Sequence, residues 1–154
     1  MVAKTLEDVK VMLEQAVAKT LSDNVYVKAV EIIQNNIEED VYSQYSPVKY
    51  KRREYSGGLI ANENLPGEMG GTKLTIKATA PPNAAYGKSA GKDLPATVEY
   101  GITENYDFYN PAKGHGFAAA RPFMQDAVTE MKGGDDIKKA IIDGLKSQGF
   151  NAHS

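Results

Sequence analysis

The sequence predicts an α+β fold in which a small antiparallel sheet packs against helices, with helices at both ends and two long loops. Apolar residues recur at helical spacing in residues 1–45 and again in residues 121–150. Residues 57–116 hold 10 of the 14 glycines and 5 of the 7 prolines, a composition that favours strands joined by turns. At 154 residues, with 42% hydrophobic and 25% charged, the chain suffices for one ordinary core. We therefore expect a single domain over residues 1–154, with strands and loops in 46–120.

The N-terminal region predicts two helical stretches. The first has a one-sided apolar stripe: Leu6, Val9, Leu13, Ala16 and Val17. The stretch Thr20–Asn24 is rich in residues that begin helices, so it predicts a break or the start of a new helix. A second stripe runs from Val30 to Val41, and Ser46-Pro47 stops the helix because the residue before proline avoids the helical region.

The middle region predicts short strands and long loops. Residues 59–65 are expected to form one strand and residues 66–71 a hairpin loop. Residues 73–79 alternate between apolar and polar side chains, as in a half-buried strand. Residues 96–100 fit either a third strand or a single helical turn. The two long loops are expected at residues 81–93 and 103–120, and long loops in a compact domain are often functional.

The C-terminal region predicts two further helices. Pro122 fits the first turn of the third helix, where its missing N–H costs nothing. Its buried stripe is expected to comprise Phe123, Ala127, Val128 and Met131, and Gly133-Gly134 ends it. The last helix has Asp135 and Asp136 at its positive end and Gly149 as its stop.

The composition argues against most enzyme classes. The chain has no cysteine and two histidines, which excludes disulfides, thiolate nucleophiles and cysteine-bound zinc. His115 lies between two glycines in a predicted loop, a poor position for a catalytic base, and no glycine pair precedes the Gly-Lys-Ser/Thr of a nucleotide site. We expect no catalytic site, no cofactor and no metal. The short apolar runs and the acidic N-terminus predict neither a membrane span nor an export signal.

One basic island interrupts a mildly acidic chain. The net charge is −2 overall, while residues 46–60 hold four bases and one acid. Within this island the segment 49–55 combines its bases with tyrosines, which leaves three interpretations open. Tyrosine and arginine are typical of protein interfaces, bases with aromatics also suit nucleic acid, and a solvated connector would look the same.

Three motifs follow one another along the chain. They are Val41-Tyr42-Ser43-Gln44-Tyr45-Ser46-Pro47 with Tyr50-Lys51-Arg52-Arg53 and Gly57-Gly58-Leu59, then Val98-Glu99-Tyr100-Gly101, then Arg121-Pro122-Phe123-Met124. Together they resemble the signatures of the tail-completion, or neck, proteins of long-tailed bacteriophages, which are often minor structural or tail components. The resemblance covers roughly residues 25–145. It departs at Leu94-Pro95-Ala96-Thr97, where that family often has a tyrosine-alanine pair.

The resemblance implies a non-enzymatic virion protein at the head–tail junction, made in the host cytoplasm. Such proteins form a ring, commonly a hexamer, that contacts the connector and tail-tube proteins and lets DNA pass without sequence-specific binding. The residues implied at subunit interfaces are Tyr45, Tyr50, Arg52, Arg53, Glu99, Tyr100 and Arg121.

The remaining motif residues are given structural roles by the same resemblance. The pair Gly57-Gly58 would set the turn into the first strand, and Gly101 ends the second motif. Pro122 and Phe123 would start the third helix and seat it on the sheet, with Phe123 as a core residue. Glu99 would pair with Arg121 or an arginine of the basic island, within or between subunits.

Two other classes of function remain open beside the phage structural protein. One is an uncharacterised enzyme, which would need a deep pocket that two histidines and no cysteine make hard to furnish. A small cytosolic adaptor that binds nucleic acid or protein would use the basic-aromatic segment 49–55. Retention on heparin with a steep salt dependence would favour that alternative.

Overall fold

The computed structural model describes residues 5–44, 53–81, 94–100 and 120–153. They divide into two compact units, which we describe separately. The first unit comprises Met1–Glu31, Gly67–Ile76 and Met131–Ser154, and the second comprises Ile32–Pro66 and Lys77–Glu130. That all 154 residues form a single domain stays a prediction.

The first unit is built on helix α1 (Leu6–Thr20), which continues without a break through the π-helical segment η1 (Leu21–Val25). Thr5 and Asp8 form a capping box at the start of α1. The predicted break at Thr20–Asn24 is wrong, because its polar side chains bond within the helix: Ser22 Oγ donates to the Lys19 carbonyl (3.0 Å), and Lys19 pairs with Asp23 (2.7 Å). The buried positions step from Thr20 to Val25, so one wide π-turn keeps the buried face in phase.

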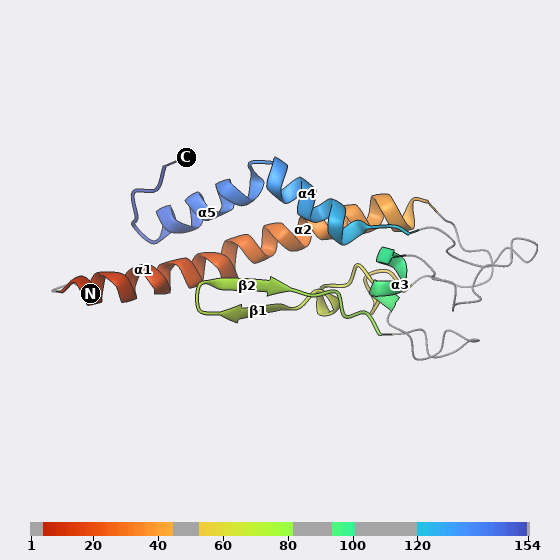
Figure 1. Ribbon diagram of the computed structural model, residues 1–154, viewed down its shortest axis with the longest axis horizontal. Coiled ribbons are helices and arrows are strands. Elements are labelled where there is room, and N and C mark those ends of the chain that lie inside the picture. Colours follow the sequence, from red (N-terminus) through yellow and green to blue (C-terminus); the bar gives the residue numbers. More distant parts are fainter. Residues whose placement is uncertain (1–4, 45–52, 82–93, 101–119, 154) are drawn as a thin grey trace, which may run out of the picture. The chain divides into compact units, whose positions relative to one another are not determined.

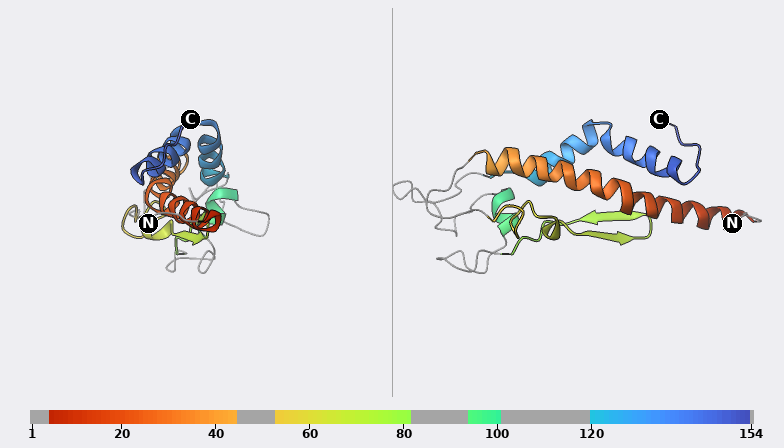
Figure 2. Two further views of the ribbon diagram at one scale, coloured as in Figure 1. Left: turned by 90° about the vertical axis from the view of Figure 1, so that its left-hand side faces the viewer. Right: turned by 180° about the vertical axis from the view of Figure 1, so that it is seen from behind.

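Helix α5 (Asp136–Ser147) and a β-hairpin lie along different sides of α1 and η1 (Figures 1 and 2). Strands β1 (Gly67–Gly70) and β2 (Lys73–Ile76) pair antiparallel, with Gly67 opposite Ile76. A Cβ atom on Gly67 would lie 2.7 Å from the Tyr26 ring, so glycine allows this close approach. The predicted loop 66–71 therefore includes strand β1, and the predicted strand 73–79 ends at Ile76.

The elements described in the second unit are helices. They are the C-terminal part of α2 (Tyr26–Asn36), the π-helical segment η2 (Ile37–Tyr42), the short 3-10 helix η3 (Asn62–Asn64), α3 (Leu94–Tyr100) and α4 (Phe123–Gly133). Its core comprises Ile32, Ile33, Ile37, Val41, Leu59, Ile60, Ala61, Leu65, Ala80, Val98, Phe123 and Ala127.

The strand predicted at residues 59–65 is wrong, because this segment forms turns and helix η3. Its successive residues Leu59, Ile60 and Ala61 are all buried, which a strand with one wet face could not achieve. The Asn64 side chain donates to the Gly58 carbonyl (2.7 Å) and so closes the turn locally. The ambiguity at residues 96–100 is resolved in favour of the helix α3.

The predicted fold class is confirmed: the protein is α+β, with helices at both ends and a small two-stranded antiparallel sheet among the described residues. Helix α4 ends at Gly133 as predicted, and Gly149 (φ +87°) follows the end of α5. The stripe of α4 is narrower than predicted, since Val128 is 37% exposed. Nearly all of the predicted loops 81–93 and 103–120 lies outside the described residues.

Candidate functional site: a carboxylate clamp on helix α4

Two of the three sequence motifs meet at the start of helix α4. In helix α3, Glu99 is buried (8% exposed), while the next residue, Tyr100, is 76% exposed. Glu99 Oε2 accepts a hydrogen bond from the Met124 amide (2.8 Å), and Oε1 accepts one from the Gln125 amide (3.0 Å). We call this arrangement the Glu99 clamp.

The clamp satisfies groups that the helix itself leaves without acceptors. The first amides of any helix have no partner within it, and the helix dipole favours a negative charge there. Pro122 occupies the cap position, because its carbonyl accepts from the Asp126 amide (2.8 Å) one residue before α4 begins. The prediction that Pro122 lies in the first turn is therefore wrong by one residue. Proline has no side-chain acceptor, so a carboxylate 25 residues earlier in the chain supplies the cap.

Arg121 links the clamp to η2, the last segment of the helical stretch that begins with α1. Its amide donates to the Val98 carbonyl (2.9 Å), and its guanidinium Nη1 donates to the Val41 carbonyl in η2 (3.2 Å). Phe123 follows at zero exposure in the core. The segments η2, α3 and α4 of the second unit are thus joined at one point by backbone atoms, one carboxylate and one guanidinium.

Two buried or partly buried polar side chains near α4, Asn36 and Asp40, differ in how well their hydrogen-bonding groups are satisfied. The Asn36 side chain donates to Glu130 Oε2 (2.8 Å) and to the Ile32 carbonyl (2.9 Å), so it is well satisfied. Asp40, in contrast, has a buried oxygen, Oδ2, without a hydrogen-bond partner. Burial, followed by the charges of Asp126 and Glu39, raises the pKa of the Asp40 carboxyl above its ordinary value.

The structure places the predicted interface residues unevenly. The Glu99 carboxylate is occupied by two backbone amides of its own chain, whereas the sequence analysis paired it with an arginine. Arg53 is exposed and donates to the Pro81 carbonyl (3.0 Å). Tyr45, Tyr50, Arg52 and Gly101 lie outside the described residues. The placement of these side chains does not test an interface role, so that role stays a prediction.

The glycine pair of the first motif forms a turn that the sequence analysis misassigned. Gly57 has a φ of +78°, and a Cβ atom on Gly58 would lie only 2.3 Å from the Glu54 carbonyl oxygen. Both positions therefore require glycine. The turn leads into the buried segment before η3 and not into a strand. That Phe123 seats α4 on the sheet stays a prediction, since β1 and β2 belong to the first unit.

The sequence motifs did not predict the clamp itself. One signal could have indicated it: the start of α4 reads Arg121-Pro122-Phe123, with no serine, threonine, aspartate or asparagine to accept from the first amides. A helix start that lacks a local cap and lies in a core needs an acceptor from elsewhere in the fold.

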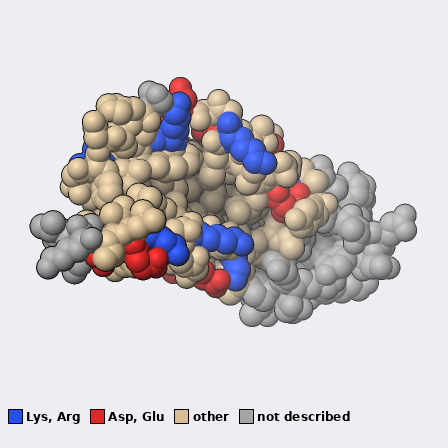
Figure 3. All heavy atoms as spheres, turned by 60° about the vertical axis from the view of Figure 1, so that its left-hand side comes forward, with Lys and Arg blue, Asp and Glu red and all other residues tan. Residues whose placement is uncertain are grey.

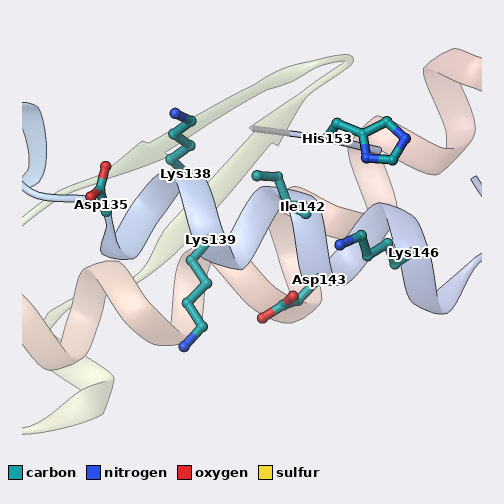
Figure 4. A pocket seen from close by; sticks show the side chains of 7 residues that line it. All are labelled: Asp135, Lys138, Lys139, Ile142, Asp143, Lys146 and His153. Carbon is teal, nitrogen blue, oxygen red and sulfur yellow. The ribbon is translucent and has the colours of Figure 1, made fainter. Parts of the chain in front are cut away.

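A surface hollow lies along α5 in the first unit, with a volume of about 630 Å³. We call it the α5 groove. It is lined by Asp135, Lys138, Lys139, Ile142, Asp143, Lys146 and His153. Lys138 and Lys139 point away from one another, so the lysines do not converge on a single small ligand (Figure 4).

Two further features, a metal-binding cluster and a membrane-spanning helix, were not found in the part of the chain that the structure describes. No group of three or more histidine, aspartate or glutamate side chains in that part could hold a metal ion. On the face shown in Figure 3, lysine and arginine side chains are interspersed with acidic ones and form no continuous patch of one charge. None of the described helices has the length and hydropathy needed to span a membrane.

Comparison with known proteins identifies the family. The model of the YomN family matches residues 5–147. The chain is 30% identical to the SPbeta prophage-derived uncharacterized protein YomN of Bacillus subtilis strain 168, over 96% of this chain and 97% of that protein. No solved structure matches. The chain therefore belongs to the YomN family, which has a prophage-derived member; this agrees with the resemblance to phage proteins at a coarse level.

Proposed function

We propose that this member of the YomN family is a structural protein of a phage particle, a subunit of the ring that joins tail to head. A relative is prophage-derived, and the two sequences match over 96% of this chain and 97% of that protein. The three motifs that resemble tail-completion proteins follow the expected order along the sequence.

The observation that carries the proposal is how the motif residues are used. The second and third motifs meet at the Glu99 clamp, where the Glu99 carboxylate accepts from the Met124 and Gln125 amides and the Arg121 amide donates to the Val98 carbonyl. A catalytic carboxylate needs access to a substrate, but the Glu99 side chain is buried and its two oxygens each hold an amide. The motifs therefore maintain a shape, which is what a ring subunit must present to its neighbours.

The proposed partners follow from that role. The ring, commonly a hexamer in the proteins that the motifs resemble, would contact the connector on one face and the tail tube on the other, and DNA would pass through it. The protein would be a virion component after assembly and would perform no chemical step.

The test is to delete the gene from its phage or prophage and examine the induced lysate by electron microscopy. We expect full heads and separate tails, and restored infectivity when the intact gene is supplied in trans. Tails of uncontrolled length would assign the terminator role within the same proposal. Normal, infectious particles from the deletion strain would overturn it.

A second measurement separates the proposal from the adaptor alternative. The purified protein is passed over heparin at physiological salt, with the salt concentration varied. We expect a structural subunit to pass through the column unretained. An adaptor that binds through segment 49–55 would be retained with a steep salt dependence.

A further inference from the structure

The N-terminal half of helix α1 exposes an apolar stripe. Leu6, Val9 and Leu13 are 87%, 50% and 47% exposed. The same stripe continues at spacings of three and four residues to Ala16 and Thr20, which are 5% and 1% exposed. Single exposed apolar residues are ordinary, but three on one helical face form a surface that favours a partner.

The cover of the stripe ends where helix α5 ends. The Gln148 side chain, just after α5, donates to the Ala16 carbonyl (3.0 Å) and to Thr20 Oγ1 (2.9 Å). A Cβ atom on Gly144 would lie 2.6 Å from Thr20 Cγ2, so the two helices approach closely there. The first turns of α1 project beyond the end of α5 and beyond the hairpin turn (Figures 1 and 2). The exposed half is thus a continuation of an established helix–helix interface.

The exposed half of α1 is acidic at its margins. Its described residues up to Glu14 include Glu7, Asp8 and Glu14 against the single base Lys10. Asp8 belongs to the capping box, and Glu7 Oε1 lies 3.8 Å from Lys10 Nζ. Interactions within the helix therefore explain part of this acidic charge. The described residues of the first unit offer no such explanation for the apolar stripe between these charges.

The α5 groove has the opposite charge balance. It carries Lys138, Lys139 and Lys146 against Asp135 and Asp143, and Ile142 and the aliphatic stems of the lysines supply apolar surface. At 100° per residue, Ile142 lies about 160° around the helix from Gly144, which faces α1. The groove therefore stays open while α1 and α5 of the same chain are packed together.

We propose that the first turns of α1 dock, through Leu6, Val9 and Leu13, in the α5 groove of a second copy of this chain. Because α1 and the α5 groove are different surfaces, each copy can give one contact and receive another, and such a heterologous contact closes into a ring or extends into a filament. The inference rests on the proposed ring and names the surfaces that join its subunits. Three side chains bury less surface than the roughly 800 Å² per partner of a standard interface, so we expect other contacts to add to this one.

The first test uses two substitutions on the same helix. Val9→Asp places a charge in the stripe, and Val11→Asp is the matched control, since Val11 is 42% exposed and lies about 200° around the helix from Val9. Circular dichroism verifies that both variants fold. By light scattering across a concentration series, we expect Val9→Asp to weaken self-association at least about tenfold and Val11→Asp to leave it unchanged. Equal effects of the two substitutions would overturn the inference.

The second test identifies the receiving surface. The chain has no cysteine, so the introduced thiols are the only ones that can react. When the Val9→Cys and Lys138→Cys proteins are mixed and treated with a short thiol cross-linker, we expect dimers that contain one of each variant. A mixture of Val11→Cys and Lys138→Cys should give few. Efficient cross-linking of Val9→Cys to itself would overturn the assignment of the α5 groove.

These outcomes are separable from those of the gene deletion. If Val9→Asp assembles as the wild type does while the deletion strain still yields separate heads and tails, the docking surface is wrong and the proposed function stands. If the deletion strain yields normal particles while Val9→Asp still dissociates, the proposed function is wrong and the contact stands. A wild-type protein that is monomeric at every concentration overturns the docking surface.

Discussion

Helices α1 and α4 solve the same problem at their first turns by different means. At α1, the Thr5 side chain accepts from the Asp8 amide (3.1 Å) and Asp8 accepts from the Thr5 amide (2.9 Å), so the cap comes from within four residues. At α4, the cap is Glu99, which comes from another helix. The α1 cap is exposed, whereas the α4 cap is buried. The difference teaches that a local cap stabilises its own helix, while a distant cap also holds together the elements that it joins.

The largest expected effect is that of removing the distant cap. Glu99→Ala leaves two amides at the start of α4 without an acceptor in a buried place, which should lower the free energy of unfolding by about 2–4 kcal/mol. Glu99→Gln keeps one acceptor oxygen and should cost about half as much. Urea unfolding measures both, and Glu63→Ala, at an exposed site in η3, is the control. A loss for Glu99→Ala no larger than that for Glu63→Ala would contradict the clamp.

A smaller effect is expected from the local cap. Thr5→Ala removes the acceptor for the Asp8 amide at an exposed helix end and should cost about 1 kcal/mol or less. Hydrogen exchange should accelerate mainly in the first turn of α1, because both hydrogen bonds of the capping box join Thr5 and Asp8 of that turn. Glu99→Ala should instead accelerate exchange in both α3 and α4. Equal spread of the two effects would remove the distinction between a local and a distant cap.

The smallest expected effect concerns a carboxylate that caps nothing. The pKa of Asp40 is raised above its ordinary value of 3.8, so the folded state binds this proton more tightly than the unfolded state does. Stability from this group is therefore present below pH 3.8 and is lost as pH rises through the raised pKa. Asp40→Asn should raise the free energy of unfolding at pH 7 by less than about 1 kcal/mol, and the gain should shrink toward pH 4.

The control for that measurement is the neighbouring carboxylate. Glu39 is exposed, and Glu39→Gln at the same two pH values should give a smaller gain, because its charge is hydrated in both states. Urea midpoints at pH 7 and pH 4.5 supply the comparison. If Asp40→Asn destabilised the protein at pH 7, the buried oxygen would have a favourable partner that the geometry does not reveal.

The sequence predicted the parts of the fold that depend on local order. Helices α4 and α5 end where their glycines predicted, and the α+β class is confirmed. The errors occur where distant contacts compete with local preference. The apolar run from Leu59 is buried on all sides and folds as turns. The helix passes through Thr20–Asn24, where polar side chains bond within the helix and α5 and the hairpin also pack against that stretch.

The sequence by itself determined that the two ends of the chain are helical, that Gly133 and Gly149 follow or end helices and which motifs point to a phage protein, because each depends on residues close together along the chain. Only the tertiary structure decided that Glu99 caps α4, that Arg121 reaches Val41 and that the stripe of α1 is covered at one end and exposed at the other. Each of these depends on where a second segment ends in space. A backbone amide or an apolar side chain specifies what kind of partner it needs, but the fold selects which residue supplies it.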